Sequence, residues 1–243
     1  MQTLVLFTIL AIASPLVTRS AIDKLVYDGY SLDYSCSQVT ANRWTYTLDQ
    51  NNKGSASRPN EYFIDPNYPE ECQQTSTDSY GEGYDRGHLV ASNHMDATEH
   101  SRYQANFMTN ILPQESRFNK VVWRTTEVMT ECYRQIKPVT VYGGVIYNDE
   151  SNDYFLASHN VRTPDLWWKV LVSKDSSGKD QVISWLFPNI AGLKEASNYI
   201  TTVAEIERQL NDGLGLIPIK STLKKVKGDV TKWPTKNCDS GSF

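Results

Sequence analysis

The stretch that decides the fold reads YDRGHLV at positions 84–90. Gly83 and Gly87 bracket its charged residues, which indicates a tightly bent backbone that presents side chains at a fixed angle. Residues two apart in a strand lie on one face, so Arg86 and His88 are expected to point the same way. An imidazole can accept a proton at neutral pH, and a guanidinium beside it can hold anionic oxygens. The pair is therefore a candidate acid–base site.

The segments around this run predict a mixed architecture. Residues 50–83 are polar and rich in turn formers, which indicates a long surface excursion. Residues 117–135 lack Pro and Gly and carry apolar residues at helical spacing, and a second helix is expected over 193–210. Segments rich in β-branched and aromatic residues predict strands at 44–48, 139–146, 167–173 and 181–187. Strands and helices without strict alternation indicate an α+β fold.

The two ends of the chain and its cysteines indicate export. Residues 4–13 form an apolar run that is too short to span a bilayer, so residues 1–20 are expected to be a signal peptide and 21–243 a single domain. The competing interpretation is a buried N-terminal strand or helix. An oxidising compartment favours two disulfides, with the pairing left open, among Cys36, Cys72, Cys132 and Cys238. The expected location is extracellular, or periplasmic in a bacterium.

Further motifs follow the first run at fixed spacing. Positions 106–114 read NFMTNILPQ, and Asn119, Trp123 and Glu127 then follow at intervals of four. In this order the motifs closely resemble the DNA/RNA non-specific endonucleases, a group of ββα-metal or His-finger nucleases. The resemblance is dense from about residue 58 to residue 147. It implies a ββα-metal nuclease fold with an antiparallel sheet core flanked by helices.

The resemblance also implies a general base and a metal site. His88 corresponds to the base that activates water, and Asn119 to the sole protein ligand of a Mg²⁺ ion, for which Mn²⁺ can substitute. An amide oxygen suits this ion, which prefers oxygen donors and keeps several waters. Glu127 matches a carboxylate that hydrogen-bonds metal-bound water. Eight helical residues span about 12 Å and turn by about 80°, so direct ligation by both side chains is not expected. The alternative for Glu127 is an exposed helix carboxylate.

Substrate contacts are implied at three positions. The resemblance places Arg58 and Arg86 at phosphate contacts and Asn110 in a supporting position beside the substrate, while Asp85 has no role beyond local anchoring. The net charge of −4 is unusual for a nucleic-acid binder, so the positive charge must be local. The lysine-rich stretch 220–236 is either a patch for a polyanion or a solvated tail.

These observations predict a secreted endonuclease that hydrolyses DNA and RNA without sequence preference and leaves 5′-phosphate ends. Two alternatives differ in class: a catalytically silent relative that only binds, and a phosphodiesterase for small nucleotides with a closed pocket around His88. No membrane contact is expected after signal removal, and the oligomeric state is open, a homodimer being one alternative. The other histidines match no catalytic position, and His94 and His100 are expected at the surface.

Overall fold

The computed structural model describes residues 22–81 and 83–239. The expected signal peptide lies outside these residues. Within the part of the chain that is described, no helix is long and apolar enough to cross a membrane.

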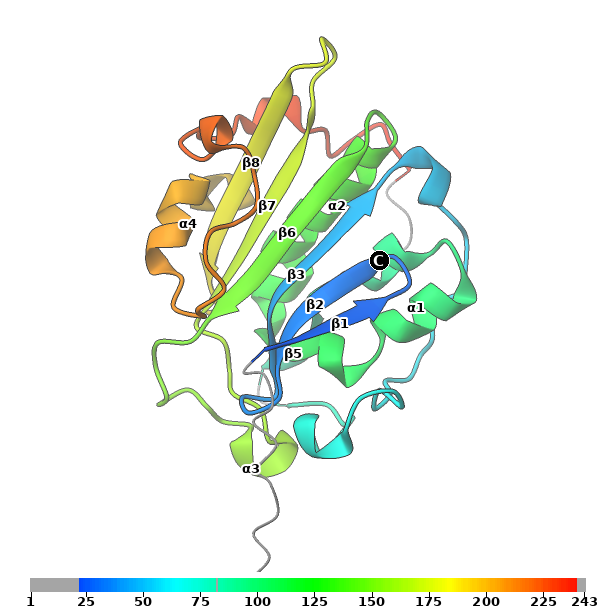
Figure 1. The fold of residues 1–243 in the computed structure, drawn as a ribbon, viewed down its shortest axis with the longest axis vertical. Helices are drawn as coiled ribbons and strands as arrows, with labels where there is room; N and C mark the ends of the chain where they lie inside the picture. The colour runs from blue at the N-terminus through cyan, green and yellow to red at the C-terminus, as the bar shows by residue number, and fades with distance from the viewer. Residues whose placement is uncertain (1–21, 82, 240–243) are drawn as a thin grey trace, which may run out of the picture.

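A seven-stranded antiparallel sheet forms the centre of the molecule (Figure 1). Its order is β1-β2-β3-β6-β7-β8-β9, so the chain leaves the sheet after β3 and returns beside it with β6. The strands are β1 (Asp23–Tyr27), β2 (Tyr30–Ser35), β3 (Thr40–Leu48), β6 (Val139–Ile146), β7 (Leu166–Lys174), β8 (Asp180–Pro188) and β9 (Ile200–Thr201).

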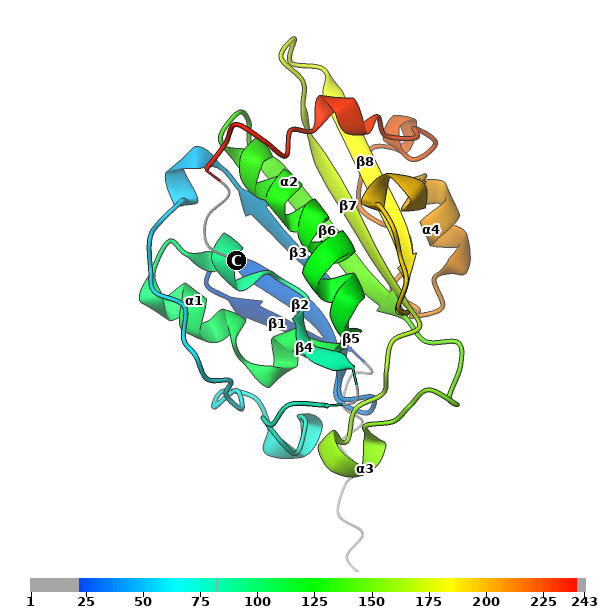
Figure 2. The same cartoon turned by 180° about the vertical axis from the view of Figure 1, so that it is seen from behind.

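A second layer covers one face of this sheet (Figure 2). It is made by the excursion between β3 and β6. Its elements are the hairpin strands β4 (Tyr84–His88) and β5 (Ile111–Glu115), and the helices α1 (Glu99–Ala105) and α2 (Arg124–Arg134). Helix α1 lies in the connection between β4 and β5, and α2 runs across the face formed by β3 and β6 (Figure 2).

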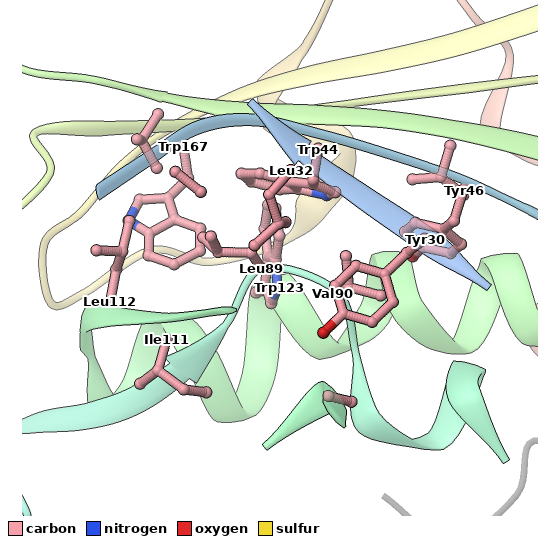
Figure 3. Close-up of a cluster of buried hydrophobic side chains, with 14 of the residues drawn as sticks. Tyr30, Leu32, Trp44, Tyr46, Leu89, Val90, Ile111, Leu112, Trp123 and Trp167 are labelled. Carbon is pink, nitrogen blue, oxygen red and sulfur yellow. The ribbon is translucent and has the colours of Figure 1, made fainter. Parts of the chain in front are cut away.

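Aromatic side chains fill the space between the sheet and α2 (Figure 3). Trp123 meets Trp44 of β3 and Trp167 of β7 edge-on, with ring centroids 6.3 and 5.3 Å apart. Leu89 and Leu112 add the hairpin to the same cluster. Each fully buried side chain of this kind contributes roughly 1.5–3 kcal/mol. The core therefore fixes both the hairpin and α2 to the sheet, and Trp123 is one of its central packing residues.

On the opposite face of the sheet, α4 (Val203–Gln209) lies over the part formed by β7 and β8, while the short α3 (Leu156–His159) lies at one end of the molecule (Figure 1). Val203 and Ile206 of α4 pack against Trp168 and Val170 of β7. Sheet and helices in these three layers confirm the α+β prediction.

The prediction of one helix over 193–210 is wrong in its first half. The segment forms a 3-10 turn at Ala196–Tyr199, then β9, and only then α4. Ile200 pairs with the edge of β8, because the edge of a sheet offers a β-branched residue hydrogen bonds that outweigh its helical spacing. Thr202 then caps the helix by accepting a hydrogen bond from the Glu205 amide at 3.2 Å.

The other predicted elements are confirmed. The predicted strand 139–146 coincides with β6, and the remaining predicted strands lie inside β3, β7 and β8. The predicted helix 117–135 contains α2, but it opens with a π-helical turn over Phe118–Trp123. Such wide turns are rare and occur frequently at functional sites.

Two disulfides tie loose parts of the chain to this framework. Cys36 is joined to Cys72 in the excursion after β3, and Cys132 of α2 is joined to Cys238 across 106 residues. The expectation of two disulfides is confirmed, and the pairing that the sequence left open is settled by the fold. The second bond holds the C-terminal segment against α2.

Candidate active site

A cleft of about 390 Å³ lies where β4 meets the start of α2. It brings together side chains from four separate segments of the second layer. Its walls include five of the six residues proposed from the sequence, namely Arg58, Arg86, His88, Asn119 and Glu127. Basic groups that the sequence did not single out, Lys120 and Arg124, also line it.

The hydrogen bonds around His88 fix the tautomer of its imidazole. Asn106 donates from Nδ2 to the carbonyl oxygens of Pro59 and Glu61, at 3.2 and 2.9 Å. Its Oδ1 therefore faces His88 Nε2, 3.1 Å away, and can only accept. Nε2 must then carry the hydrogen, which leaves Nδ1 as the basic nitrogen.

The surroundings of His88 keep this imidazole neutral. Burial lowers the pKa of His88 to about 3, and the positive charges of Arg58 and Arg86 act in the same direction. The hydrogen bond with Asn106 opposes the shift but does not reverse it. The ring is thus unprotonated throughout the neutral range, so Nδ1 keeps its lone pair free.

Arg86 is held in place by two contacts. Its Nη1 donates to the Thr77 carbonyl oxygen at 2.7 Å, and its guanidinium carbon lies 3.9 Å from the centroid of the Tyr62 ring. The Tyr62 ring also lies 5.6 Å from the His88 ring. These contacts leave other guanidinium hydrogens to face the cleft, where an oxyanion could be bound by more than one of them. Arg58 is exposed at the rim.

Asp85 orients the amide of Asn119. Its Oδ2 accepts from Asn119 Nδ2 at 3.0 Å, while Oδ1 accepts from Ser116 Oγ at 2.8 Å and Lys120 Nζ at 3.0 Å. Burial works against the charge of Asp85, but these hydrogen bonds outweigh it and leave its pKa below the usual value. Because Nδ2 donates to Asp85, the Oδ1 atom of Asn119 points away from Asp85. Asp85 thus acquires a definite role that the sequence did not assign.

The donor set suits a hard divalent ion. Among the described residues, no group of three or more His, Cys, Asp or Glu side chains could hold a metal. An ion bound by the Asn119 oxygen would keep most of its water shell, as Mg²⁺ prefers. Glu127 lines the same cleft and is buried at 8 % exposure, so the alternative of an exposed carboxylate is wrong. The residues fit an ion with one direct protein ligand.

Comparison with known proteins identifies the family of the chain. The model of the DNA/RNA non-specific endonuclease family matches residues 12–223. The chain belongs to this family. A protein from Nostoc sp. named "Nuclease" is 29% identical over 156 residues, which is 63% of this chain and 56% of that protein. "Endonuclease G, mitochondrial" from Caenorhabditis elegans is 26% identical over 162 residues, which is 61% of this chain and 52% of the relative.

The chain spans about half the length of these two relatives. "Nuclease C1" from Cunninghamella echinulata is 25% identical over 186 residues, 71% of this chain and 73% of the relative. A crystal structure of an EndoG/EndoGI complex superposes with a TM-score of 0.59 at 19% identity, over 82% of this chain and 88% of that chain. This likeness confirms the ββα-metal nuclease fold of the family member described here.

Asn110 stands apart from the other proposed residues of this endonuclease family member. It is fully buried, its Oδ1 accepts from the Val90 amide, and its Nδ2 donates to the Val90 and Ala105 carbonyl oxygens. All of these partners are main-chain atoms, and Asn110 does not line the cleft. The expected part in substrate binding is not supported. Asn110 instead braces the strand end that carries His88.

The net charge of the chain is −4, so a nucleic-acid site requires positive charge in one place. Basic side chains gather at the cleft. Four basic residues line the cleft, which are Arg58, Arg86, Lys120 and Arg124. In the stretch 220–236, Lys220 pairs with Asp180 and Lys224 with Glu207, and this stretch contributes no residue to the cleft wall. Asp85 and Glu127 line the cleft as well and Lys120 pairs with Asp85, so basic side chains outnumber acidic ones at the cleft by four to two.

One side chain of the site, Asn106, was not singled out from the sequence, and the environment predicted for another, His94, is wrong. Asn106, which fixes the His88 tautomer, lies inside the quoted motif 106–114, and its position there was the available signal. The expectation that His94 lies at the surface is wrong, because its side chain is 1% exposed and bonded to Tyr46 and to the Glu127 carbonyl. His100 is exposed, as expected.

Proposed function

We propose that this protein is a secreted endonuclease that hydrolyses the phosphodiester bonds of DNA and RNA without sequence preference. The observation that carries the proposal is the neutral His88, whose basic Nδ1 shares one cleft with arginines and with the oxygen donor Asn119. A base, an anion grip and a cation ligand are the groups that phosphodiester hydrolysis requires. Family membership supports the same reaction class.

His88 takes the proton of the attacking water. Nδ1 accepts this proton, while Nε2–H stays bonded to Asn106 and keeps the ring at a fixed angle. Arg58 and Arg86 hold the phosphate and stabilise the charge that develops on it. A bound Mg²⁺ at Asn119 would supply Lewis-acid stabilisation of the leaving 3′ oxygen. Hydrolysis on that side of phosphorus leaves the phosphate on the 5′ end.

Polymeric substrates are favoured over small nucleotides. Arg58, Lys120 and Arg124 at the cleft are exposed, so they can follow a sugar–phosphate chain beyond one nucleotide. Contacts of this kind recognise the backbone and carry no base information. Both observations support cleavage without sequence preference. The presence of a complete base and cation ligand in one cleft speaks against a silent binding module.

Digestion of a supercoiled plasmid and of total RNA tests the reaction. Cleavage of both polymers with Mg²⁺ or Mn²⁺, and its loss in EDTA, is expected. A His88→Ala variant should lose roughly 10²–10⁴-fold of the rate while keeping its urea midpoint. Ligation of the products without prior phosphorylation reports 5′-phosphate ends. Full activity in the variant would remove His88 from the mechanism, and no cleavage by wild type would favour the silent relative.

Export is proposed on the apolar run at residues 4–13 and on the two disulfides, which persist in oxidising compartments. Several relatives carry the word "mitochondrial" in their names, which makes the location worth testing directly. Expression of the full chain in eukaryotic cells should place the protein in the medium, with a new N-terminus near residue 21 by mass spectrometry. Retention of residues 1–20 on an intracellular protein would contradict export.

A further inference from the structure

A fully buried lysine lies directly behind the cleft. Lys169 stands on β7, on the sheet face that α2 covers, and is 1% exposed. Its Nζ donates to Thr126 Oγ1 at 2.9 Å and lies 3.7 Å from the centroid of the Trp123 ring. Both contacts are to the helical segment that also carries Asn119 and Glu127.

Neither contact neutralises the ammonium. Thr126 is an uncharged acceptor whose own hydroxyl donates to the Trp123 carbonyl oxygen at 2.7 Å. A ring face attracts a cation, but by much less than a buried charge loses when it leaves water. A buried ammonium in a folded protein calls for a buried negative charge nearby.

Glu127 is placed to supply that charge, because it is buried and directly follows Thr126, the hydrogen-bond partner of Lys169, in α2. Burial lowers the pKa of Lys169, and the nearby Glu127 carboxylate opposes the shift. The relation is reciprocal: burial raises the pKa of Glu127, and Lys169 is the largest of the charges that oppose this rise, ahead of Arg58 and Arg124. The lysine approaches from the sheet and the two arginines from the cleft. Glu127 thus lies between two sources of positive charge.

The main chain of Glu127 is fixed separately. The carbonyl oxygen of Glu127 accepts from His94 Nε2 at 3.1 Å, and His94 Nδ1 accepts from the Tyr46 hydroxyl at 2.9 Å. Burial depresses the pKa of His94, and the charges of Lys169 and Arg134 add to the effect, so this ring is neutral. His94 therefore holds the backbone without adding charge, and Lys169 is the charged group that acts on the carboxylate from inside the core.

We propose that Lys169 is a positioning residue of the active site, whose buried ammonium keeps the Glu127 carboxylate ionised at the inner wall of the cleft. The role of Glu127 in cleavage rests on the proposed function, whereas the coupling of the two charges does not. An ionised carboxylate only accepts hydrogen bonds from cleft waters, but a protonated one donates as well. Loss of the ammonium would therefore change how Glu127 orients water.

The test replaces the charge and keeps most of the volume. In a Lys169→Met variant the pKa of Glu127 should rise by about one unit or more. Glutamate labelled with ¹³C at the carboxyl carbon reports this pKa by NMR, with the Glu127→Gln variant identifying the signal. Arg134→Met is the matched control, because Arg134 is also buried and paired on α2, with Asp96 and Glu131. It should lower the urea midpoint without moving the Glu127 signal.

Cleavage and stability give two further readouts. On the acid limb of the pH–rate profile, Lys169→Met should be about tenfold slower than wild type for each unit by which the pKa rises. Lys169→Met should lower the urea midpoint in the wild-type background but not in Glu127→Gln, where no buried carboxylate is left unpaired. If the single variant does not fold and the double variant does, the coupling is confirmed.

Each negative result has a separate meaning. An unchanged Glu127 pKa in Lys169→Met, or equal destabilisation in both backgrounds, would show that Lys169 only fills the core and would overturn the proposal. Failure of both single and double variants to fold would do the same, since the effect would then not depend on Glu127. A wild-type protein that cleaves neither DNA nor RNA would refute the proposed function, while the NMR and urea measurements would still decide the coupling.

Discussion

Removing the Asp85 carboxylate should weaken cation binding at the proposed site while leaving the ligand Asn119 in the chain. In the Asp85→Ala variant, Asn119 Nδ2 loses the acceptor that lies 3.0 Å away, and Ser116 Oγ loses its partner at 2.8 Å. The Asn119 amide can then turn over and present Nδ2 where Oδ1 is needed. A nitrogen that carries two hydrogens cannot bind a cation, so the turned form is inactive.

The size of the effect follows from the bonds that are lost. A hydrogen bond to a charged group contributes about 1.5–3 kcal/mol, and the one from Asn119 Nδ2 selects between the two amide orientations. Lys120 adds little, because its side chain is 66% exposed. At about 1.4 kcal/mol per factor of ten, the bias corresponds to roughly 10–100-fold in cation affinity.

The assay is the plasmid cleavage rate measured over a range of Mg²⁺ concentrations. The half-saturating concentration should rise roughly 10–100-fold in Asp85→Ala, while saturating Mg²⁺ restores much of the rate. Asp33→Ala is the control, because Asp33 is a carboxylate paired with Lys24 at 3.1 Å on the β1–β2 hairpin and does not line the cleft. An unchanged half-saturating concentration in Asp85→Ala, with the urea midpoint preserved, would refute the orienting role.

Three further results are expected. In Gly87→Ala the new Cβ would lie 2.4 Å from Gln114 Cβ, so the free energy of unfolding in urea titrations should fall by about 1–3 kcal/mol. An unchanged free energy of unfolding would mean that β4 and β5 can move apart to make room. Replacing Cys132 and Cys238 by Ser opens a 106-residue loop and should lower the free energy of unfolding by about 4–5 kcal/mol in denaturant titrations; a loss below about 1 kcal/mol would contradict this. Because the pKa of His88 is about 3 when folded and 6.5 when unfolded, the unfolded chain takes up this proton first. Stability should therefore fall as the pH drops below about 6.5, by up to about 1.4 kcal/mol per unit, and urea titrations of His88→Asn should lack this part of the slope.

The part of the site that could be predicted lies close together in the sequence. His88 and Arg86 share one strand, and Asn119 and Glu127 share the helical segment that follows its partner strand. Strand alternation and helix periodicity therefore decide most of their relative placement. The strand 139–146 was predicted with its bounds because most of its residues are β-branched or aromatic.

The failures share one cause, which is contact with residues distant in the chain. The segment 193–210 follows a helical pattern, yet Ile200 is drawn into the edge of β8. His94 is polar and isolated in sequence, but Tyr46 of β3 and the main chain of Glu127 satisfy it in the core. Asn110 matches a family position, and only its three main-chain partners reveal that it braces a strand.

The sequence by itself determined the family and the α+β architecture, and it singled out the candidates for the base and the cation ligand, because these depend on residue types at short spacing. Only the tertiary structure decided which nitrogen of His88 is basic, how Asn119 is oriented, and which charge stands behind Glu127. Lys169 lies 43 residues from Thr126 and in another layer. In the sequence it is one residue within a predicted strand, and nothing there links it to Glu127. Protonation and amide orientation depend on burial and on partners within hydrogen-bonding distance, and those are fixed by packing between layers.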